Sequence, residues 1–322
     1  MQDMRINWRL FAGFLAAFAL SVSSYGAASE YPNKPIRIVT AAPGGGADFA
    51  ARVTAQGLTD VLGRQVIVEN RGLVAIEIVA KALPDGYTVL LYGSALWLAP
   101  FTHNVSWEPV RDFSAVAGVT NTPNILVVHP SVPVKSVQEL IALAKAKPGE
   151  LNYASGSIAT TTHLGSELFK AMAGVDIVRI AYKGNGPALI ALLGGTEAQL
   201  MFANVGTVAP HVKSGKLRAL AVTTAKPTKL APGVPTVSAS GLPGYLLETT
   251  TVIVAPAGTP ARIVNFLSQQ IVKSLNEPAT KERFFNSGVE VVGSSPEQLA
   301  AEIKADMVRW GKVIKDAGIR VD

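Results

Sequence analysis

The sequence contains no cysteine and only four histidines, and this scarcity excludes several kinds of site at once. Without a thiol in 322 residues there is no disulfide framework, thiolate metal site, cysteine nucleophile or lipid-modified N-terminal cysteine. Stability must then come from burial, and a chain of about 300 residues can bury roughly three quarters of its unfolded surface. No cofactor is expected, and the length favours two domains.

Aromatic side chains are also sparse, at 7% of residues, and Lys and Arg are scattered along the chain. A nucleic-acid groove needs basic stretches combined with aromatic stacking platforms, so no nucleic-acid partner is expected. The formal net charge of +6 is modest and favours only weak steering of anions.

The first residues are typical of a cleavable secretory signal peptide. Arg5 and Arg9 precede an apolar run over residues 10–22, which is short for a membrane helix because a span needs about 20 apolar residues. Cleavage is expected after Ala28, so residues 1–28 form the signal peptide and the secreted chain starts near Ser29. A retained N-terminal anchor is the weaker alternative.

From residue 31 onward, strand-like apolar runs alternate with helical stretches, which favours an α/β fold with parallel strands covered by helices. Strands are expected at residues 36–40, 65–69, 87–91, 124–129, 151–154, 177–182, 198–202, 217–223 and 251–255. Helices are expected at residues 48–62, 75–82, 137–145, 164–173, 187–193, 207–213, 262–275 and from 296. Residues 227–243, rich in Pro, Gly, Ser and Thr, are expected to connect the second unit back to the first.

The strongest local signal is the segment PGGGAD at residues 43–48, placed between an expected strand and an expected helix. Glycines let the main chain turn tightly and approach a ligand, and a helix start presents unpaired N–H groups and a partial positive charge. The segment lacks the Lys-Ser/Thr ending of a phosphate loop and the spacing of a dinucleotide fingerprint. It therefore indicates binding of an anion other than a nucleotide, while a tight turn with Asp48 as helix cap is the alternative.

Small and polar residues follow other expected strands, where open α/β sheets bind their ligands. They occur at Ser94, residues 155–163, residues 183–187 and residues 203–207. The stretch 155–163 supplies hydroxyl and main-chain donors before an apolar helix, an arrangement suited to a carboxylate. Asn204 either caps a helix or contacts the ligand, and both interpretations stay open.

Little in the sequence indicates catalysis. There is no G-x-S-x-G elbow, no H-E-x-x-H helix and no pair of histidines at metal-ligand spacing. His163, near Ser157, is the one candidate general base, and a structural role at a helix start explains it better. A secreted α/β hydrolase that uses Ser157 or Ser94 is the weaker alternative, and we expect that the protein is not an enzyme.

Many short signatures occur in order along the chain after residue 30. They are YPxKPIR from Tyr31, PGGGxD from Pro43, VENR from Val68, PDGY from Pro84, DF from Asp112, YKGxGP from Tyr182, GKLRALAV from Gly215 and APAGTP from Ala255. In these signatures the chain resembles the periplasmic substrate-binding proteins of tripartite tricarboxylate transporters, the Bug family, over essentially its whole mature length.

The resemblance implies a two-lobed periplasmic binding protein fold (type II-like), in which each lobe is a mostly parallel sheet flanked by helices and two crossing strands form the hinge. Lobe 1 would comprise residues 29–124 plus about 225–322, and lobe 2 residues 125–224. The implied function is periplasmic capture, as a monomer, of a small organic acid by lobe closure, for the membrane components of the transporter. A periplasmic ligand sensor without a transport role is the alternative.

The resemblance also assigns ligand contacts by position. They are Gly45, Gly46, Asp48 and Ser94 in lobe 1, and Ser155, Thr160, Thr161, Tyr182, Gly184 and Asn204 in lobe 2. Members of the family hold a ligand carboxylate through loops and two bridging waters. This chain departs from the family at Ala41, where an aromatic residue is usual, at residues 157–159, where Ser-Ile-Ala replaces Gly-Asn-Gly, and after Arg71, where the turn is shorter.

Overall fold

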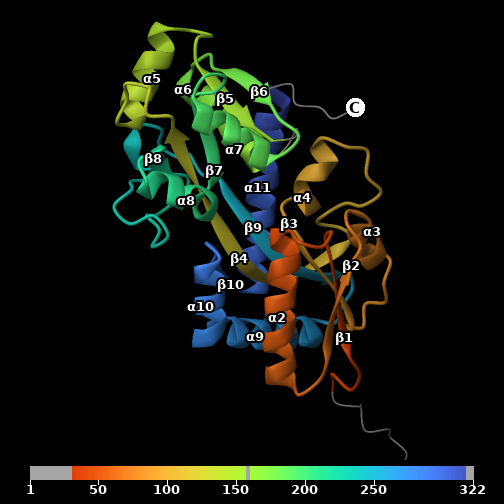
Figure 1. Cartoon of the computed structure of the whole chain (residues 1–322). Helices are drawn as coiled ribbons and strands as arrows, with labels where there is room; N and C mark the ends of the chain where they lie inside the picture. Colours follow the sequence, from red (N-terminus) through yellow and green to blue (C-terminus); the bar gives the residue numbers. More distant parts are fainter. Residues whose placement is uncertain (1–30, 157–159, 317–322) are drawn as a thin grey trace, which may run out of the picture.

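Two β-sheets that share one long strand form the centre of the protein (Figure 1). The computed structural model describes residues 31–156 and 160–316. The shared strand, β4 (Phe113–Val128), pairs with the first sheet up to Pro123 and with the second sheet from Asn124 onward. The predicted signal peptide (residues 1–28) and the departure at residues 157–159 lie outside the described residues.

The first sheet contains three parallel strands that are extended by antiparallel ones. β1 (Ile36–Thr40) lies between β2 (Val66–Asn70) and β3 (Thr88–Gly93) and is parallel to both. β9 (Glu248–Pro256) pairs antiparallel with β3 and with β4, and β10 (Glu290–Ser294) pairs antiparallel with β4. The predicted α/β fold is confirmed, and the strands that cross between the halves make the sheet a mixed one.

The second sheet has the same plan. β5 (Asn152–Ser155) lies between β6 (Val178–Ala181) and β7 (Leu200–Asn204) and is parallel to both. The last part of β4 runs antiparallel between β7 and β8 (Arg218–Val222). β7 and the last part of β4 are nearly continuous apolar runs because both faces of the sheet are covered there.

Helices cover both faces of each sheet. On the first sheet, one face is covered by α2 (Gly46–Leu62), α9 (Ala261–Asn276) and α10 (Pro278–Asn286), and the other by α3 (Val74–Ala80), α4 (Ala95–Leu98) and α11 (Pro296–Asp316). On the second sheet, one face is covered by α5 (Val137–Ala146) and α6 (Thr161–Ala173), and the other by α7 (Asn185–Gly194) and α8 (Val205–Lys213). Two short 3-10 helices lie at Ala99–Phe101 and Ser238–Ser240. Among the helices that the structure describes, none is both long and apolar enough to span a bilayer.

Two segments tie the halves together beside the crossing strands. α11 contacts α4 and β4 of the first half and α6 of the second, and Trp310 on this helix is buried in the core that they share. The chain between β8 and β9 packs on the second sheet, where the hydroxyl of Tyr245 donates to the carbonyl of Gly165 at 2.9 Å. The division into residues 29–124 plus about 225–322 and residues 125–224 stays a prediction.

Candidate functional site

The carboxyl ends of parallel strands from both sheets meet beside the crossing strand β4. Gly93, at the end of β3, pairs with Thr251 on β9, which in turn pairs with Thr120 on β4. Asn204, at the end of β7, pairs with Asn124, four positions further along β4. At about 3.3 Å per residue, the two strand ends are therefore roughly 13 Å apart along this strand. Such ends are where α/β sheets bind ligands.

A hydrogen bond joins the two halves in this region. The hydroxyl of Thr249 on β9 donates to Thr161 Oγ1 at the start of α6, at 3.3 Å. Asn124 Nδ2 donates to Thr249 Oγ1 at 3.2 Å. β1 ends on the same side, because its Thr40 pairs with Leu91 of the parallel strand β3. These strand ends and contacts define what we call the front edge: Gly45, Gly46, Ser94, Thr161, Asn204 and Thr249.

The loop that precedes α2 presents bare main chain at the front edge. Gly44 has a φ of +83°, which favours glycine, whereas Gly45 has a φ of −89°, which any residue adopts. A Cβ added to Gly46 would meet no heavy atom within 4 Å. Neither backbone strain nor packing explains Gly45 and Gly46, and an exposed helix start of this kind suits an anion.

Asp48 turns its carboxylate into this loop. One oxygen accepts the N–H of Gly44 at 2.9 Å, and the other accepts from Asn70 Nδ2 at 2.9 Å and pairs with Arg52 Nε at 3.0 Å. The hydrogen bond from Gly44 is the main cause that lowers the pKa of Asp48, with further contributions from Asn70 and Arg52. Asp48 thus clamps the loop, and a direct ligand contact by its carboxylate stays a prediction.

In the second half, Thr162 organises the starts of two helices. Its Oγ1 donates to Asn185 Oδ1 at 3.1 Å, accepts the N–H of Gly156 at 3.2 Å and lies 3.0 Å from Thr160 Oγ1. A Cβ on Gly156 would lie 2.5 Å from Asn185 Oδ1, so only glycine permits this close approach. The contacts bring the start of α6 next to the start of α7, whose N-cap is Gly184.

Two predicted contacts have their side chains engaged elsewhere. Ser155 is buried, and its Oγ accepts from Arg179 Nε at 2.8 Å. The hydroxyl of Tyr182 donates to Glu197 at 2.8 Å, whereas its main-chain N–H donates to the carbonyl of Ser155 at 2.9 Å. Ligand contacts by these two side chains stay predictions, and they would require the present hydrogen bonds to be shared or replaced.

Sequence reasoning missed Thr249 and Asn124, which hold the front edge together. Thr249 belongs to the run ETTTV and Asn124 to TPNIL, and neither stretch carries the glycines that marked the loop before α2. A stretch of three threonines before an apolar run is the one local trace of this role, because hydroxyls there would be unusual in a fully buried strand.

The departures at Ala41 and after Arg71 lie close to the front edge. The N–H of Arg71 donates to the carbonyl of Thr40 at 2.9 Å, so the turn before α3 starts beside the end of β1. In that turn and at the start of α3, Leu73 and Val74 are 46% and 59% exposed. This part of the molecule therefore presents an apolar surface in addition to the partly buried Ala41.

His163 lies just inside α6 and is 5% exposed. Burial, followed by the nearby charge of Arg179, lowers the pKa of His163 to about 4. Such an imidazole is a weak base, which removes the main support for a hydrolase. Within residues 31–156 and 160–316, there is also no group of three or more His, Asp or Glu arranged to hold a metal ion.

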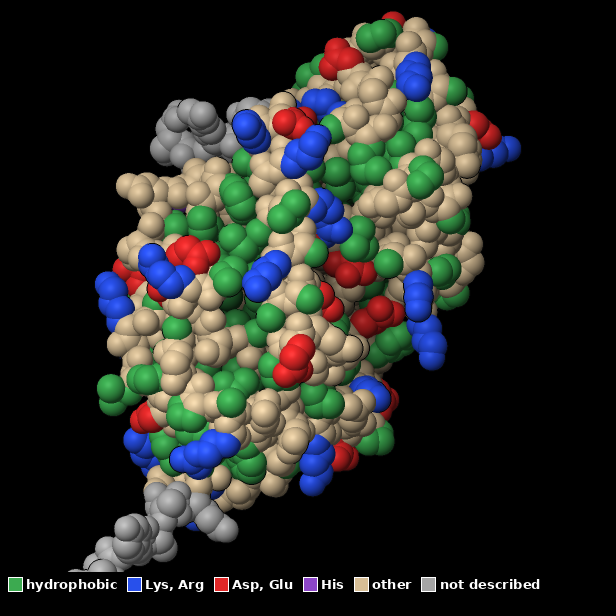
Figure 2. Space-filling view, turned by 180° about the vertical axis from the view of Figure 1, so that it is seen from behind, with side chains coloured by type: hydrophobic (Ala, Val, Ile, Leu, Met, Phe, Trp, Pro, Cys, Tyr) green, Lys and Arg blue, Asp and Glu red, His purple; other side chains and the backbone are tan. Residues whose placement is uncertain are grey.

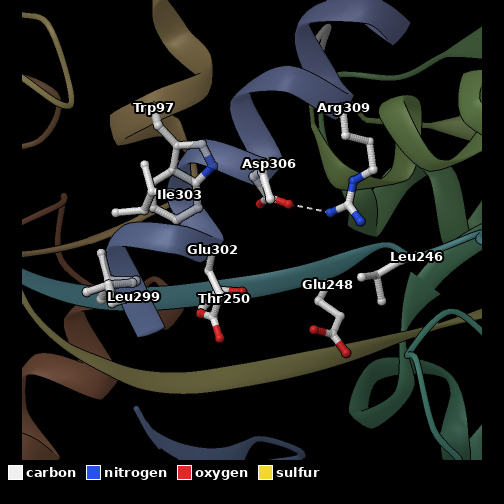
Figure 3. Close-up of a pocket in the computed structure, with 11 residues that line it drawn as sticks. Trp97, Leu246, Glu248, Thr250, Leu299, Glu302, Ile303, Asp306 and Arg309 are labelled. Atoms are coloured by element: carbon white, nitrogen blue, oxygen red, sulfur yellow. Dashed lines mark hydrogen bonds and ion pairs between the residues drawn. The ribbon is translucent and has the colours of Figure 1, made fainter. Parts of the chain in front are cut away.

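A cavity of about 210 Å³ lies behind the crossing strands, and we call it the rear cavity (Figure 3). Its lining residues come from α4, β9, α11 and the segment before β9: Trp97, Leu246, Glu248, Thr250, Val252, Leu299, Glu302, Ile303, Ala305, Asp306 and Arg309. Seen from this side, acidic side chains gather near the middle of the molecule (Figure 2). None of the ten predicted ligand contacts lines the rear cavity.

Carboxylates dominate the charge of the rear cavity. Burial raises the pKa of Glu248, Glu302 and Asp306, and the mutual repulsion of the carboxylates adds to this for Glu302. Arg309 pairs with Asp306 and is the one cation among the lining residues (Figure 3). Because like charges repel, the rear cavity is a poor site for an organic acid.

Comparisons with known proteins agree with the arrangement of the fold. A family model described as the tripartite tricarboxylate transporter family receptor matches residues 50–319. Protein BugT of Bordetella pertussis (strain Tohama I) is 35% identical over 302 residues, which cover 91% of this chain and 92% of BugT.

Two solved structures are similar over most of their length. The structure of R. palustris Rpa4515 with adipate has 34% identity and a TM-score of 0.73, and the match covers 91% of this chain and 100% of that one. The structure of MatC from Rhodopseudomonas palustris with bound malate has 27% identity and a TM-score of 0.68, with 88% and 100% covered.

Proposed function

The chain belongs to the tripartite tricarboxylate transporter family of receptors, and from this premise we propose that it captures a small dicarboxylic acid at the front edge by closure of its two halves. The acid is then delivered to the membrane components of such a transporter. The protein acts as a monomer, reaches the periplasm by means of residues 1–28, and performs no chemistry on its ligand.

The observation that carries this proposal is the meeting of strand ends from both sheets at the crossing strands. The hydrogen bond from Thr249 to Thr161 and the pairing of Asn124 with Asn204 connect the starts of α6 and α8 to the strands on which the halves hinge. Helix starts offer main-chain N–H groups that donate hydrogen bonds to a carboxylate, and a partial positive charge that attracts it, so binding needs no metal or cofactor.

Magnitudes explain why both halves are needed. A hydrogen bond to a charged group contributes about 1.5–3 kcal/mol, and association costs about 4 kcal/mol or more. Three such bonds from one half therefore leave little net affinity, whereas micromolar binding needs about 8 kcal/mol. Contacts from the second half supply the difference, and the ligand drives closure because only the closed form makes both sets.

The two structural neighbours that hold adipate and malate support a dicarboxylate as the ligand class. In this chain the front edge is lined by hydroxyls and main chain, while Leu73 and Val74 add an exposed apolar surface beside the end of β1. Such a combination suits a molecule with a carboxylate at its end and methylene groups between its charges.

Calorimetric titration of the purified protein tests the proposal. We expect that at least one acid from a panel of adipate, malate, other C4–C8 dicarboxylates and citrate binds with 1:1 stoichiometry and micromolar affinity. Small-angle scattering should then show a smaller radius of gyration with the acid than without it. Absence of binding across the panel, or equal binding of the matching neutral diamides, would overturn the proposal.

A further inference from the structure

A cation lies directly behind the turn that leads from β5 toward α6. Arg179 on β6 donates from Nε to Ser155 Oγ at 2.8 Å and from Nη2 to the carbonyl of Gly156 at 2.9 Å. Its neighbour on β5 is Tyr153, so its side chain lies on the face of the sheet that α6 covers. The guanidinium thus holds the turn that the start of α6 approaches through Thr162.

Arg179 forms hydrogen bonds with two neutral oxygens, but no ion pair with the acidic side chains that the structure describes. In the part of the chain that the structure describes, no carboxylate forms an ion pair with Arg179, whereas Arg37, Arg52, Arg71, Arg111 and Arg309 all have one. The nearby Glu167 is engaged by the hydroxyl of Tyr153 and by Lys170, which pairs with it at 3.0 Å. His163, the remaining titratable group that faces Arg179 from α6, is neutral at neutral pH, because burial lowers its pKa to about 4.

An unpaired, half-buried cation is costly unless something compensates its charge. Here both acceptors of the guanidinium are neutral, so its charge is spread over the turn and adds to the partial positive charge at the start of α6. An anion that binds in front of this turn would supply the negative charge that these two neutral acceptors lack.

We propose that Arg179 is the specificity-determining cation of the acid site: through the turn at Ser155 and Gly156 it fixes a positive charge behind the second half of the front edge. It makes the site prefer a dianion to the singly charged or neutral analogue of the same acid. This inference rests on the proposed function and assigns to it a residue outside the predicted ligand contacts.

Arg218 is a matched control for Arg179. It lies in the same sheet, has no ion pair among the described residues, and donates to two main-chain carbonyls, those of Val132 and Val134, at 3.0 and 2.9 Å. It pairs with Val128 at the end of β4 that is remote from Asn124 and the front edge. The two arginines thus have similar structural roles and differ in their distance from the acid site.

The test is a titration of wild type, Arg179→Gln, Arg179→Lys and Arg218→Gln with the tightest-binding dicarboxylate of the panel and with its monoamide, at low and at high salt. We expect Arg179→Gln to weaken dianion binding about tenfold and the monoamide far less, and to flatten the dependence of affinity on salt. Arg179→Lys keeps the charge and should restore most of the salt dependence, while Arg218→Gln should match wild type in both respects.

The outcomes separate this inference from the proposed function. If wild type binds no acid, the proposed function fails and the inference fails with it. If wild type binds an acid and Arg179→Gln binds it equally well, the inference alone is overturned. If Arg179→Gln loses affinity equally for the dicarboxylate and for its monoamide, and Arg179→Lys does not restore it, Arg179 only supports the fold and the inference is overturned. Circular dichroism and melting curves of all variants verify that they are folded.

Discussion

The two faces of the crossing strand β9 carry opposite chemistry. On one face, Thr249 contacts the start of α6 at the front edge, where the described side chains offer hydroxyls and amides. On the other face, Glu248 and Thr250 line the rear cavity together with two carboxylates of α11. Successive residues of a strand point to opposite sides, so one short segment separates a donor-rich surface from an acidic one.

This difference would keep the proposed acid site free of like charge. The three carboxylates of the rear cavity have raised pKa values because they are buried near one another, whereas Asp48, two residues beyond Gly46 of the front edge, is neutralised by Arg52 and by hydrogen bonds. A carboxylate that approaches the front edge would therefore meet hydrogen-bond donors and no uncompensated negative charge among the described residues that form it. The predictions below test whether the two faces are as independent as this arrangement requires.

The largest effect is expected from moving a carboxylate to the front face. Thr249→Asp places a negative charge beside Thr161 and Asn124, and should weaken binding of a dicarboxylate by about 100-fold or more, because juxtaposed like charges cost several kcal/mol. Calorimetric titration measures this loss.

Two variants serve as controls for Thr249→Asp. Thr249→Asn has the same shape without the charge and should lose much less affinity. Thr250→Asp adds the charge to the opposite face of the same strand, so it should lower stability with little effect on affinity. Equal losses of affinity in Thr249→Asp and Thr250→Asp would refute the independence of the two faces.

The next effect concerns the clamp in the first half. Asp48→Asn removes the charge that holds Gly44 and Arg52 and should lower the free energy of unfolding by about 2 kcal/mol at pH 7. Because the pKa of Asp48 is lowered in the folded state, its contribution is present above the unfolded pKa of about 3.9 and is lost as the pH falls through the folded pKa. Wild type and variant should therefore converge in urea unfolding at acidic pH.

Asp60→Asn is the matched control, because Asp60 lies on the same helix and, among the described residues, its side chain hydrogen-bonds only to Gln56. It should leave stability nearly unchanged at both pH values. A stability difference for Asp48→Asn that is the same at pH 7 and at pH 3 would mean that the carboxylate charge is not what holds the loop.

A smaller effect is expected at the bare main chain. Gly46→Ala should leave stability unchanged or raise it by up to about 1 kcal/mol, since alanine favours a helix and the added Cβ meets no atom within 4 Å. If a carboxylate approaches this helix start, the same Cβ should weaken binding several-fold. Gly194→Ala is the control, because Gly194 ends α7 and a Cβ added there also meets no heavy atom within 4 Å. It should change neither the affinity for the acid nor the closure of the two halves. If Gly46→Ala binds the acid as tightly as wild type does, the ligand does not contact the start of α2.

The sequence predicts those parts of the fold that are set by local pattern. The strand at residues 36–40 agrees with β1 at both ends, and the glycine-rich loop before α2 lies where the motif indicated, because apolar runs and turn residues act over a few positions. Residues 113–123 of β4 were not predicted as a strand. Their small and polar side chains show no alternation, and they are held instead by β9 and β10, which are distant in sequence.

The candidate site divides in the same way. Main-chain features at strand ends were predictable from glycines and helix starts, whereas the orientation of a side chain depends on distant partners. Asp48 turns toward Asn70, Tyr182 toward Glu197 and Thr249 toward Thr161, 88 residues away. No local pattern encodes these pairs, because each one depends on how segments distant in sequence pack together, and the position of Thr249 depends on the register of the crossing strands.

The smallest effect is expected in the rear cavity and concerns its dependence on pH. Glu302→Gln removes one of three crowded carboxylates, and should raise the melting temperature by about 2 °C at neutral pH with no change in affinity for an acid. The sign follows from linkage: a carboxyl whose pKa is raised by folding binds protons more readily in the native state, so native stability falls as the pH rises through that pKa. The gain should therefore vanish below the unfolded pKa of about 4.3, where glutamate is neutral in both states.

Glu282→Gln on α10, outside the cavity lining, is the control and should show no gain in melting temperature at either pH. A change in acid affinity on Glu302→Gln would mean that the charge of the rear cavity reaches the front edge through the crossing strands.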